Sequence, residues 1–373
     1  MMKAVILAGG QDIGKCPLSL VRPRPLFPVP SGVLLQNVLH VLGSADVDEA
    51  IICANGKTHI LREHFGANPG GCVGLDYHED KLPRGAAGCL RDVADSLKHG
   101  TFIVIEGGLF IDGGIDELLA EHRRSGNALT IGAVPAGNWQ AGNGNEPLHR
   151  RLSPVGIYIV EPDVLPHIPD RGFYDIKEQL VPELLKRKVG VRAARFTGLH
   201  RRMANAGSYS LFVQEMLAGA FGEGHLAGYR EAAPHVWIAP DASVDPSASI
   251  VGPAVIGPNA VVERNVTILG PSLISESAAV GGQSVVVSSI LWSHASIGSA
   301  ASIEQSIVTD DFCVPARSRL ENCIAVDRDL NAGEMHGLRQ GGYTIATPGR
   351  VRILEPANSV VRAVSGFCRS LLC

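Results

Sequence analysis

The chain has 373 residues, too many for one ordinary hydrophobic core and enough for two domains. Its 33 basic and 37 acidic residues give a formal net charge of −4, which excludes the strongly basic surface of a nucleic-acid-binding protein and a broad membrane-seeking surface. No apolar run is long enough to span a bilayer, and residues 1–10 enter a predicted strand directly, without a signal peptide. We therefore expect a cytoplasmic protein.

Residues 4–7 are apolar and predict a short buried strand that runs into Gly9 and Gly10. Glycines at the end of a strand let the backbone turn tightly and bring its N–H groups close to a phosphate. Up to about residue 228, strands alternate with helical stretches, which predicts a mostly parallel sheet covered on both faces. The expected strands are 4–7, 49–53, 102–105, 129–134 and 156–160, and the expected helices are 34–42, 115–124, 176–185 and 208–217.

After Pro234, aliphatic residues recur every six positions, with small residues two places before most of them. This hexapeptide repeat predicts a parallel β-helix over residues 229–330, in which each hexad forms one flat side of a triangular coil. The period slips at residues 288–291 and returns at Ile297. His294 falls near a corner, and we interpret it as a corner residue rather than an acyltransferase histidine. The aliphatic positions are Ile238, Val244, Ile250, Ile256, Val262, Ile268, Ile274, Val280 and Val286.

Residues 331–373 form a tail without the repeat. Within it, residues 358–372 predict a short amphipathic helix that docks on the β-helix or on a neighbouring subunit, with contact to a membrane surface as the alternative. One face of this helix carries Val360, Val364, Phe367 and Leu371.

Eight cysteines lie along the chain without a C-x-x-C pair or a histidine spacing typical of zinc. We therefore predict reduced, mostly buried thiols and no metal site among them. They are Cys16, Cys53, Cys72, Cys89, Cys313, Cys323, Cys368 and Cys373.

Five segments carry the motifs of one known family, in that family's order. They match L-A-G-G-x-G-T-R with R-P-K-P-L-x-P-V (residues 7–29), P-L-G-T-A-G-A-L (82–90), a strand ending in N-G-D (102–112), N-A-G-I-Y (154–162) and W-x-D-I-G-T (203–209). The chain thus resembles the sugar-1-phosphate nucleotidylyltransferases, or nucleotide-sugar pyrophosphorylases, of the mannose-1-phosphate guanylyltransferase and glucose-1-phosphate nucleotidylyltransferase type. This resemblance implies an α/β fold: a Rossmann-like nucleotidyltransferase domain with a mostly parallel mixed sheet (1–228), then a left-handed parallel β-helix of hexapeptide repeats (229–330) and the tail.

The resemblance also implies where ligands bind. A sugar phosphate would lie beside Gly156 and Tyr158. The nucleotide would be bound by Leu7, Ala8, Gly9, Gly10, Arg24, Gly85, Ala87 and Gly88.

The charged members of the family site are replaced in this chain. The family arginine is Gly14, its metal-binding aspartates are Gly108 and Asn205, and its P-K-P lysine is Arg24. The segment before Pro154 lacks the lysine of the family's E-K-P motif. Because Mg²⁺ needs hard oxygen donors, usually carboxylates, we predict no catalytic residue, metal or cofactor at these positions.

Two hypotheses follow. We favour a pseudoenzyme that binds a nucleotide or nucleotide-sugar and acts as a regulatory or scaffolding subunit in polysaccharide biosynthesis. It would form a homo-oligomer through the β-helix, and the family suggests an active paralogue as a further partner. The alternative is an active sugar-1-phosphate nucleotidylyltransferase that makes GDP-mannose or an NDP-glucose, with Mg²⁺ on rearranged ligands such as Asp112 or Asp12. Lys15, Arg24 and Arg84 are expected to be solvated surface cations.

Overall fold

The computed structural model describes residues 2–9, 16–56, 58–67, 73–80, 82, 84–135, 152–221 and 226–326, with strand segments at 339–340, 343–346 and 352–353. The chain forms two compact units. The first contains Met1–Asp12, Arg22–Phe27 and Val33–Met203, and the second contains Ile13–Val21, Pro28–Gly32 and Ala204–Cys373. No helix among these described residues is both long and apolar enough to cross a bilayer.

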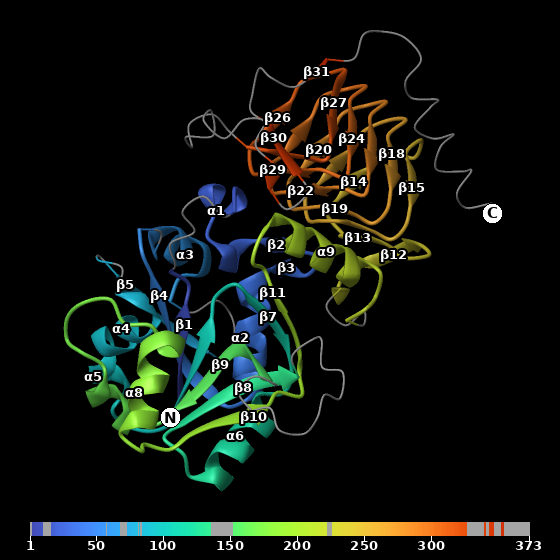
Figure 1. Ribbon diagram of the computed structural model, residues 1–373. Coiled ribbons are helices and arrows are strands. Elements are labelled where there is room, and N and C mark those ends of the chain that lie inside the picture. Colours follow the sequence, from blue (N-terminus) through green and yellow to red (C-terminus); the bar gives the residue numbers. More distant parts are fainter. Residues whose placement is uncertain are drawn as a thin grey trace, which may run out of the picture. The chain divides into compact units, whose positions relative to one another are not determined.

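A seven-stranded sheet forms the centre of the first unit, in the order β10-β8-β9-β6-β1-β4-β5 (Figure 1). Its neighbouring strands are parallel except for β9, which runs antiparallel to β6 and to β8. This mixed, mostly parallel sheet confirms the predicted Rossmann-like fold. The strands are β1 (Met2–Leu7), β4 (Val47–Ala54), β5 (Gly74–Glu79), β6 (Phe102–Glu106), β8 (Leu129–Pro135), β9 (Leu152–Val160) and β10 (Val191–Arg195).

Helices cover both faces of this sheet, and the alternation of side chains along β1 divides the core between them. Ala4 and Ile6 pack on one face, and Val5 and Leu7 pack on the other. The first face is covered by α2 (Leu34–Ser44), α3 (Thr58–Phe65) and α6 (Ile115–Ser125). The second is covered by α4 (Gly85–Asp92), α5 (Ala94–Leu97), the π-helical turn η3 (Ile176–Leu180) and α8 (Val181–Lys186).

Short elements complete the first unit. Strand β7 (Leu109–Asp112) follows β6 after two glycines and pairs antiparallel with β11 (Leu199–Arg202). The short 3₁₀ helices η1 (Arg24–Leu26) and η2 (Pro162–His167) connect longer elements. Gly107 and Gly108 therefore lie where the chain leaves the central sheet at the end of β6 and enters β7 in a separate two-stranded sheet.

The second unit contains a parallel β-helix of three sheets, as the hexapeptide repeat predicts, and its architecture is consistent with the left-handed β-helix that the family resemblance implies (Figure 1). Many of its corner residues have positive φ, among them His294 at 60°, which is exposed as expected of a corner residue. The first sheet contains β12 (Arg230–Ala233), β13 (Val236–Ile238), β16 (Ala254–Ile256), β19 (Ser272–Ile274), β22 (Ile290–Leu291), β25 (Ile307–Val308), β28 (Cys323–Ala325), β30 (Tyr343–Ala346) and β29 (Arg339–Gln340).

The other two sheets complete each coil. One contains β14 (Ser243–Val244), β17 (Val261–Val262), β20 (Ala279–Val280), β23 (Ser296–Ile297) and β26 (Cys313–Val314). The other contains β15 (Ser249–Val251), β18 (Thr267–Leu269), β21 (Val285–Val287), β24 (Ser302–Glu304), β27 (Ser318–Glu321) and β31 (Arg352–Ile353). Outside the coils lie α1 (Leu18–Val21), β2 (Pro28–Val29), β3 (Gly32–Val33) and α9 (Ala206–Leu217).

The slip in the repeat is a change in coil length. Ile256 pairs with Ile274, 18 residues on, whereas Ile274 pairs with Leu291 and Leu291 with Val308, each 17 residues on. The missing residue is lost at one corner. There, three buried serines form a ladder, in which each hydroxyl oxygen accepts a hydrogen bond from a backbone N–H of the next coil: Ser289 N to Ser272 Oγ (3.2 Å), Ser306 N to Ser289 Oγ (3.1 Å) and Cys323 N to Ser306 Oγ (3.0 Å).

The described strands of the segment 331–373 join the β-helix. Strand β30 pairs parallel with β28, and β31 pairs antiparallel with β27. The predicted helix at 358–372 lies outside the described residues, so its docking stays a prediction.

Candidate functional site

The glycine loop after β1 lies at the carboxyl end of the central sheet, where ligands of open α/β sheets collect. Leu7, the last residue of β1, is in register with Cys53 on β4 and with Glu106 on β6. The N–H groups of Ala8 and Gly9 both donate to the Cys53 carbonyl oxygen, at 2.8 and 3.0 Å. These two amides therefore have an acceptor within the protein. Gly10 and Gly14 lie outside the described residues.

Arg24 covers Gly108, the position of the first family aspartate. A Cβ atom placed on Gly108 would lie 3.0 Å from Arg24 Cδ and 3.8 Å from Arg24 Nη1. Arg24 is half-buried, so the expectation of a solvated surface cation is wrong for this residue: its stem packs on the loop after β6.

The residues here do not fit Mg²⁺, because Gly108 offers no donor and a guanidinium lies beside it. Asp112 is the exposed last residue of β7, at the opposite end of that strand from Gly108. Asp12 lies outside the described residues. In the described part of the chain, no three His, Cys, Asp or Glu side chains are grouped so as to hold a metal ion.

Asn205, at the position of the second family aspartate, has a structural role in the second unit. It is the N-cap of α9: its Oδ1 accepts from Ser208 N at 2.9 Å, and Ser208 Oγ accepts from Asn205 N at 3.0 Å. This reciprocal capping box satisfies two N–H groups at the helix terminus. The side-chain oxygen of Asn205 is therefore already used as a hydrogen-bond acceptor.

The candidate nucleotide loop begins α4, with Gly85 at φ +77°. The N–H groups of Ala87 and Gly88 donate to the Tyr174 carbonyl oxygen at 3.0 and 3.1 Å, and Tyr174 N donates to the Arg84 carbonyl oxygen at 2.7 Å. The segment after η2 thus closes the first turn of α4. A phosphate would have to displace Tyr174 to reach these two amides.

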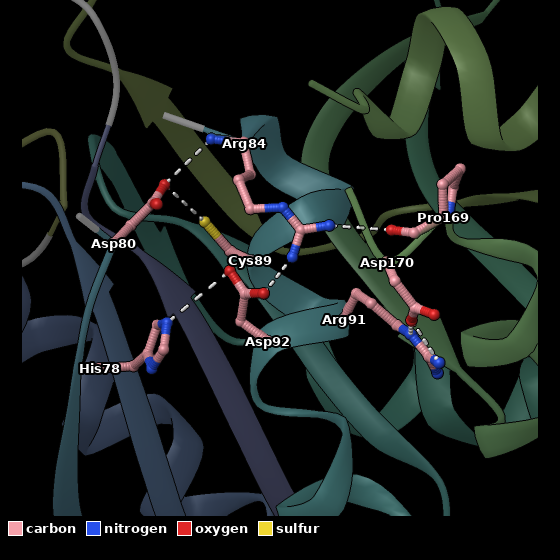
Figure 2. Close-up of polar contacts among 8 residues, drawn as sticks. All are labelled: His78, Asp80, Arg84, Cys89, Arg91, Asp92, Pro169 and Asp170. Carbon is pink, nitrogen blue, oxygen red and sulfur yellow. Dashed lines mark hydrogen bonds and ion pairs between the residues drawn. The ribbon is translucent and has the colours of Figure 1, made fainter. Parts of the chain in front are cut away.

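Figure 2 shows the contacts that Arg84 makes with residues of α4 and of the segment after η2. Arg84 forms an ion pair with Asp92 and donates from Nη2 to the Pro169 carbonyl oxygen at 2.8 Å. Only 15% of its side chain is exposed. The expectation of a solvated cation is therefore wrong for Arg84 as well, because acceptors on α4 and after η2 hold its guanidinium. Nearby, Arg91 pairs with Asp170 at 2.6 Å.

Asp80 and Cys89 lie beneath the same loop (Figure 2). Asp80 is buried and accepts from Arg84 N at 3.2 Å and from Cys89 Sγ at 3.5 Å. Burial, together with the charge of Asp80, raises the pKa of Cys89 to about 12. Burial likewise raises the pKa of Cys53 well above its usual range. These two thiols are free and buried, as the sequence predicts for most of its cysteines.

The candidate sugar side contains a charged cluster that the sequence did not indicate. Glu106 Oε1 is 2.9 Å from Lys177 Nζ, and Glu106 Oε2 pairs with Arg202 Nη1. Tyr158 Oη donates to Glu106 Oε1 at 3.3 Å. Gly156 has φ +95°, and a Cβ there would lie 2.6 Å from Arg202 Nη2. Gly156 therefore leaves the space that the Arg202 side chain occupies.

The ionisation of this cluster follows from its contacts. Burial alone raises the pKa of Glu106, but the hydrogen bond from Arg202 and the charge of Lys177 outweigh it and hold the pKa below its usual range. Burial and the nearby Glu106 carboxylate raise the pKa of Tyr158. At neutral pH the cluster is therefore one carboxylate, two cations and a neutral phenol.

Comparison with known proteins identifies both parts of the chain. The family model Nucleotidyl transferase matches residues 3–141, and GMPPB C-terminal domain matches residues 232–329. A mannose-1-phosphate guanylyltransferase from Mycobacterium tuberculosis is 25% identical over 198 residues, covering 49% of this chain and 55% of that protein. The mannose-1-phosphate guanylyltransferase catalytic subunit beta from Dictyostelium discoideum is 27% identical over 134 residues, covering 35% and 37%. A UTP–glucose-1-phosphate uridylyltransferase from Synechocystis sp. is 23% identical over 349 residues, covering 84% and 88%.

The matched region spans about half of the first of these relatives and less of the second. A mixed sheet with a glycine loop after its first strand, followed by a β-helix, is the domain order of a nucleotidyltransferase-like domain with an appended β-helical domain. Because the two family models cover these two parts in the same order, the chain belongs to the sugar-1-phosphate nucleotidylyltransferase family. The binding roles expected of the individual site residues stay predictions.

Proposed function

We propose that this chain is a nucleotide- or nucleotide-sugar-binding member of its family that has lost metal-dependent nucleotidyl transfer. The observation that carries the proposal is Gly108 packed beneath Arg24. Transfer to a nucleotide α-phosphate depends on cationic charge, in large part Mg²⁺, positioned by carboxylates. At this position a guanidinium replaces the carboxylate, and it repels a metal ion.

The capping role of Asn205 supports the same conclusion. An amide oxygen that already accepts a backbone N–H is a weaker metal ligand than a carboxylate, and its loss from the cap would destabilise α9 by about 1 kcal/mol. Two positions that supply metal ligands in the family thus have other contacts in this chain.

Ligand binding is proposed at the carboxyl end of the central sheet. Arg24 supplies a permanent positive charge there, and an arginine can bind a phosphate with two parallel hydrogen bonds. The proposed nucleotide contacts are Leu7, Ala8, Gly9, Gly10, Arg24, Gly85, Ala87 and Gly88, with Gly156 and Tyr158 on the sugar side. Because four of the backbone amides in this set already have internal acceptors, we expect modest affinity.

The proposed role is regulatory or scaffolding, in the cytoplasm, where nucleotide sugars for polysaccharide synthesis are made. The β-helix would assemble copies of this chain, or join it to an active paralogue. The relatives that this chain matches are named as transferases. Through its β-helix, an inactive chain would join an assembly of active transferase subunits without itself catalysing transfer.

The test is calorimetric titration of the purified chain with GTP, GDP-mannose, UDP-glucose and ADP-glucose, each with Mg²⁺ and with a chelator. A pyrophosphate-release assay on every ligand that binds follows, with an active mannose-1-phosphate guanylyltransferase assayed in parallel. We expect binding that is independent of Mg²⁺ and no pyrophosphate above background. Mg²⁺-dependent turnover would refute the proposal in favour of an active enzyme with rearranged ligands, and Asp112→Asn would then show whether Asp112 is one of them.

A further inference from the structure

Three charged side chains from three separate elements meet beside Gly156. Glu106 ends β6, Lys177 lies in η3, and Arg202 ends β11. Lys177 and Arg202 contact different oxygens of the same carboxylate, and Arg202 Nη2 also donates to the Val155 carbonyl oxygen at 3.2 Å. The two cations are therefore held on either side of one anionic group.

The cluster is accessible to solvent. The exposed fractions are 23% for the Glu106 side chain, 42% for Lys177 and 39% for Arg202. Charged side chains that only stabilise the core would have smaller exposed fractions than these three. The cluster also adjoins the glycine loop, because Glu106 is in register with Leu7 and the next residue, Gly107, donates from its N–H to Leu7 O at 3.0 Å.

The charges of the cluster do not balance. One carboxylate faces two cations, so the group carries a net charge of about +1 at neutral pH. Arginine and lysine bind carboxylates and phosphates through the same charge-assisted hydrogen bonds, and a phosphate monoester offers more charge and a third oxygen. The geometry that holds Glu106 would therefore hold a phosphate as well or better.

We propose that Lys177 and Arg202 form a phosphate site for a sugar phosphate or the sugar-side phosphate of a nucleotide sugar, and that Glu106 is a built-in anion that occupies this site. The inference rests on the proposed function, because it names the ligand group that this side of the same site takes. The chain lacks the lysine of the E-K-P motif, and Lys177 and Arg202 supply positive charge from other elements. Glu106 competes with the ligand and weakens its binding.

The test is calorimetric titration of the full chain with inorganic phosphate and with glucose 1-phosphate. Glu106→Gln keeps the side-chain size and removes the charge, so we expect at least tenfold tighter binding than in the wild type. Lys177→Met in the Glu106→Gln background should abolish that gain. Glu106→Asp, which withdraws the carboxylate from the cations, should give a smaller gain and serves if the amide variant does not fold.

Glu121 provides a matched control. It is 22% exposed and also lies between two cations, at 2.8 Å from Arg192 Nη2 and 2.6 Å from Arg124 Nη1, but on α6 rather than at the strand ends. Glu121→Gln should leave phosphate affinity unchanged within twofold. An equal gain in this control, or no gain in a folded Glu106 variant, would overturn the inference.

The failure of this inference differs from the failure of the proposed function. If the wild type binds GDP-mannose and Glu106→Gln gains no affinity for phosphate, only the phosphate site is wrong. If Glu106→Gln gains affinity for phosphate while the wild type binds none of the nucleotides, the phosphate site stands and the nucleotide-binding role falls.

Discussion

Replacing Ser289 by alanine tests whether the serine ladder holds the shortened corner of the β-helix. Ser289 is fully buried, its hydroxyl donates to the Val287 carbonyl oxygen at 2.7 Å, and its oxygen accepts from Ser306 N at 3.1 Å. The corner is one residue shorter than the corner before it, so the strand ladder does not supply these partners.

The expected loss of stability follows from the hydrogen-bonding group that Ser289→Ala leaves without a partner. Alanine removes the acceptor of Ser306 N in a buried corner, and an unsatisfied buried N–H costs about 1–3 kcal/mol. The net value of the donated hydrogen bond adds about 1 kcal/mol, partly offset by the gain from burying a methyl group. We therefore expect the free energy of unfolding of the second unit to fall by about 2 kcal/mol.

Equilibrium unfolding in guanidinium chloride, followed by tryptophan fluorescence, measures this loss in a Trp139→Phe background, where the remaining tryptophans, among them the fully buried Trp292, belong to the second unit. Ser289→Cys is the matched variant, because Cys323 stands at the same corner two coils on and its Sγ donates to the Glu321 carbonyl oxygen at 3.1 Å. It should lose less than the alanine variant. A loss below about 0.5 kcal/mol in Ser289→Ala would refute the reasoning, since surface substitutions change stability by that much.

Three further outcomes are expected. The cations beside Glu106 outweigh the effect of burial and lower the pKa of its carboxyl group. The stability that this carboxylate contributes is therefore present above the unfolded pKa of about 4.3 and is lost as the pH falls through the lower folded pKa. Between about pH 5 and 3, the melting temperature of Glu106→Gln should vary less than that of the wild type. At pH 8, Ellman's reagent followed by peptide mapping should modify the exposed Cys313 and leave Cys89, whose pKa is raised to about 12, unmodified until denaturant is added. Gly85→Ala places a Cβ 2.7 Å from a backbone carbonyl oxygen at φ +77° and should lower the free energy of unfolding of the first unit by about 2–4 kcal/mol, whereas Gly126→Ala, at φ +60° with open space around it, should cost only about 1 kcal/mol.

The repeat and the buried strands could be predicted from the sequence because their side chains follow a simple period. All five predicted strands of the first unit lie within observed ones. The edge strands β5 (Gly74–Glu79) and β10 (Val191–Arg195) were not predicted. Most positions of β5 carry a polar side chain, and β10 has one large aliphatic residue, Val191, beside two alanines and two arginines. An edge strand buries little of its surface, so neither segment contains the apolar run that predicts a buried strand.

The candidate site shows a sharper limit. Motif positions such as Gly108 could be located in the chain, but the side chain that covers Gly108 could not, because that contact joins residues 24 and 108. The cluster around Glu106 joins residues 106, 177 and 202, and neither cation lies at a charged position of a family motif. The expectation that Arg84 is solvated rested on its residue type alone, whereas its acceptors are Asp92, the last residue of the helix that Arg84 caps, and the carbonyl oxygen of Pro169.

The starting end of the β-helix has one feature with a wider consequence. Strand β12 runs antiparallel along β13 and covers the first strand of its sheet, while β14 and β15 begin the other two sheets in the described part of the chain. Parallel coils can grow only by adding another coil in the same direction, and the reversed β12 cannot serve as its template. The antiparallel strand β12 thus ends the parallel stack of this sheet at its first coil. It limits the end-to-end polymerisation that the exposed strand edges of a β-helix would otherwise favour.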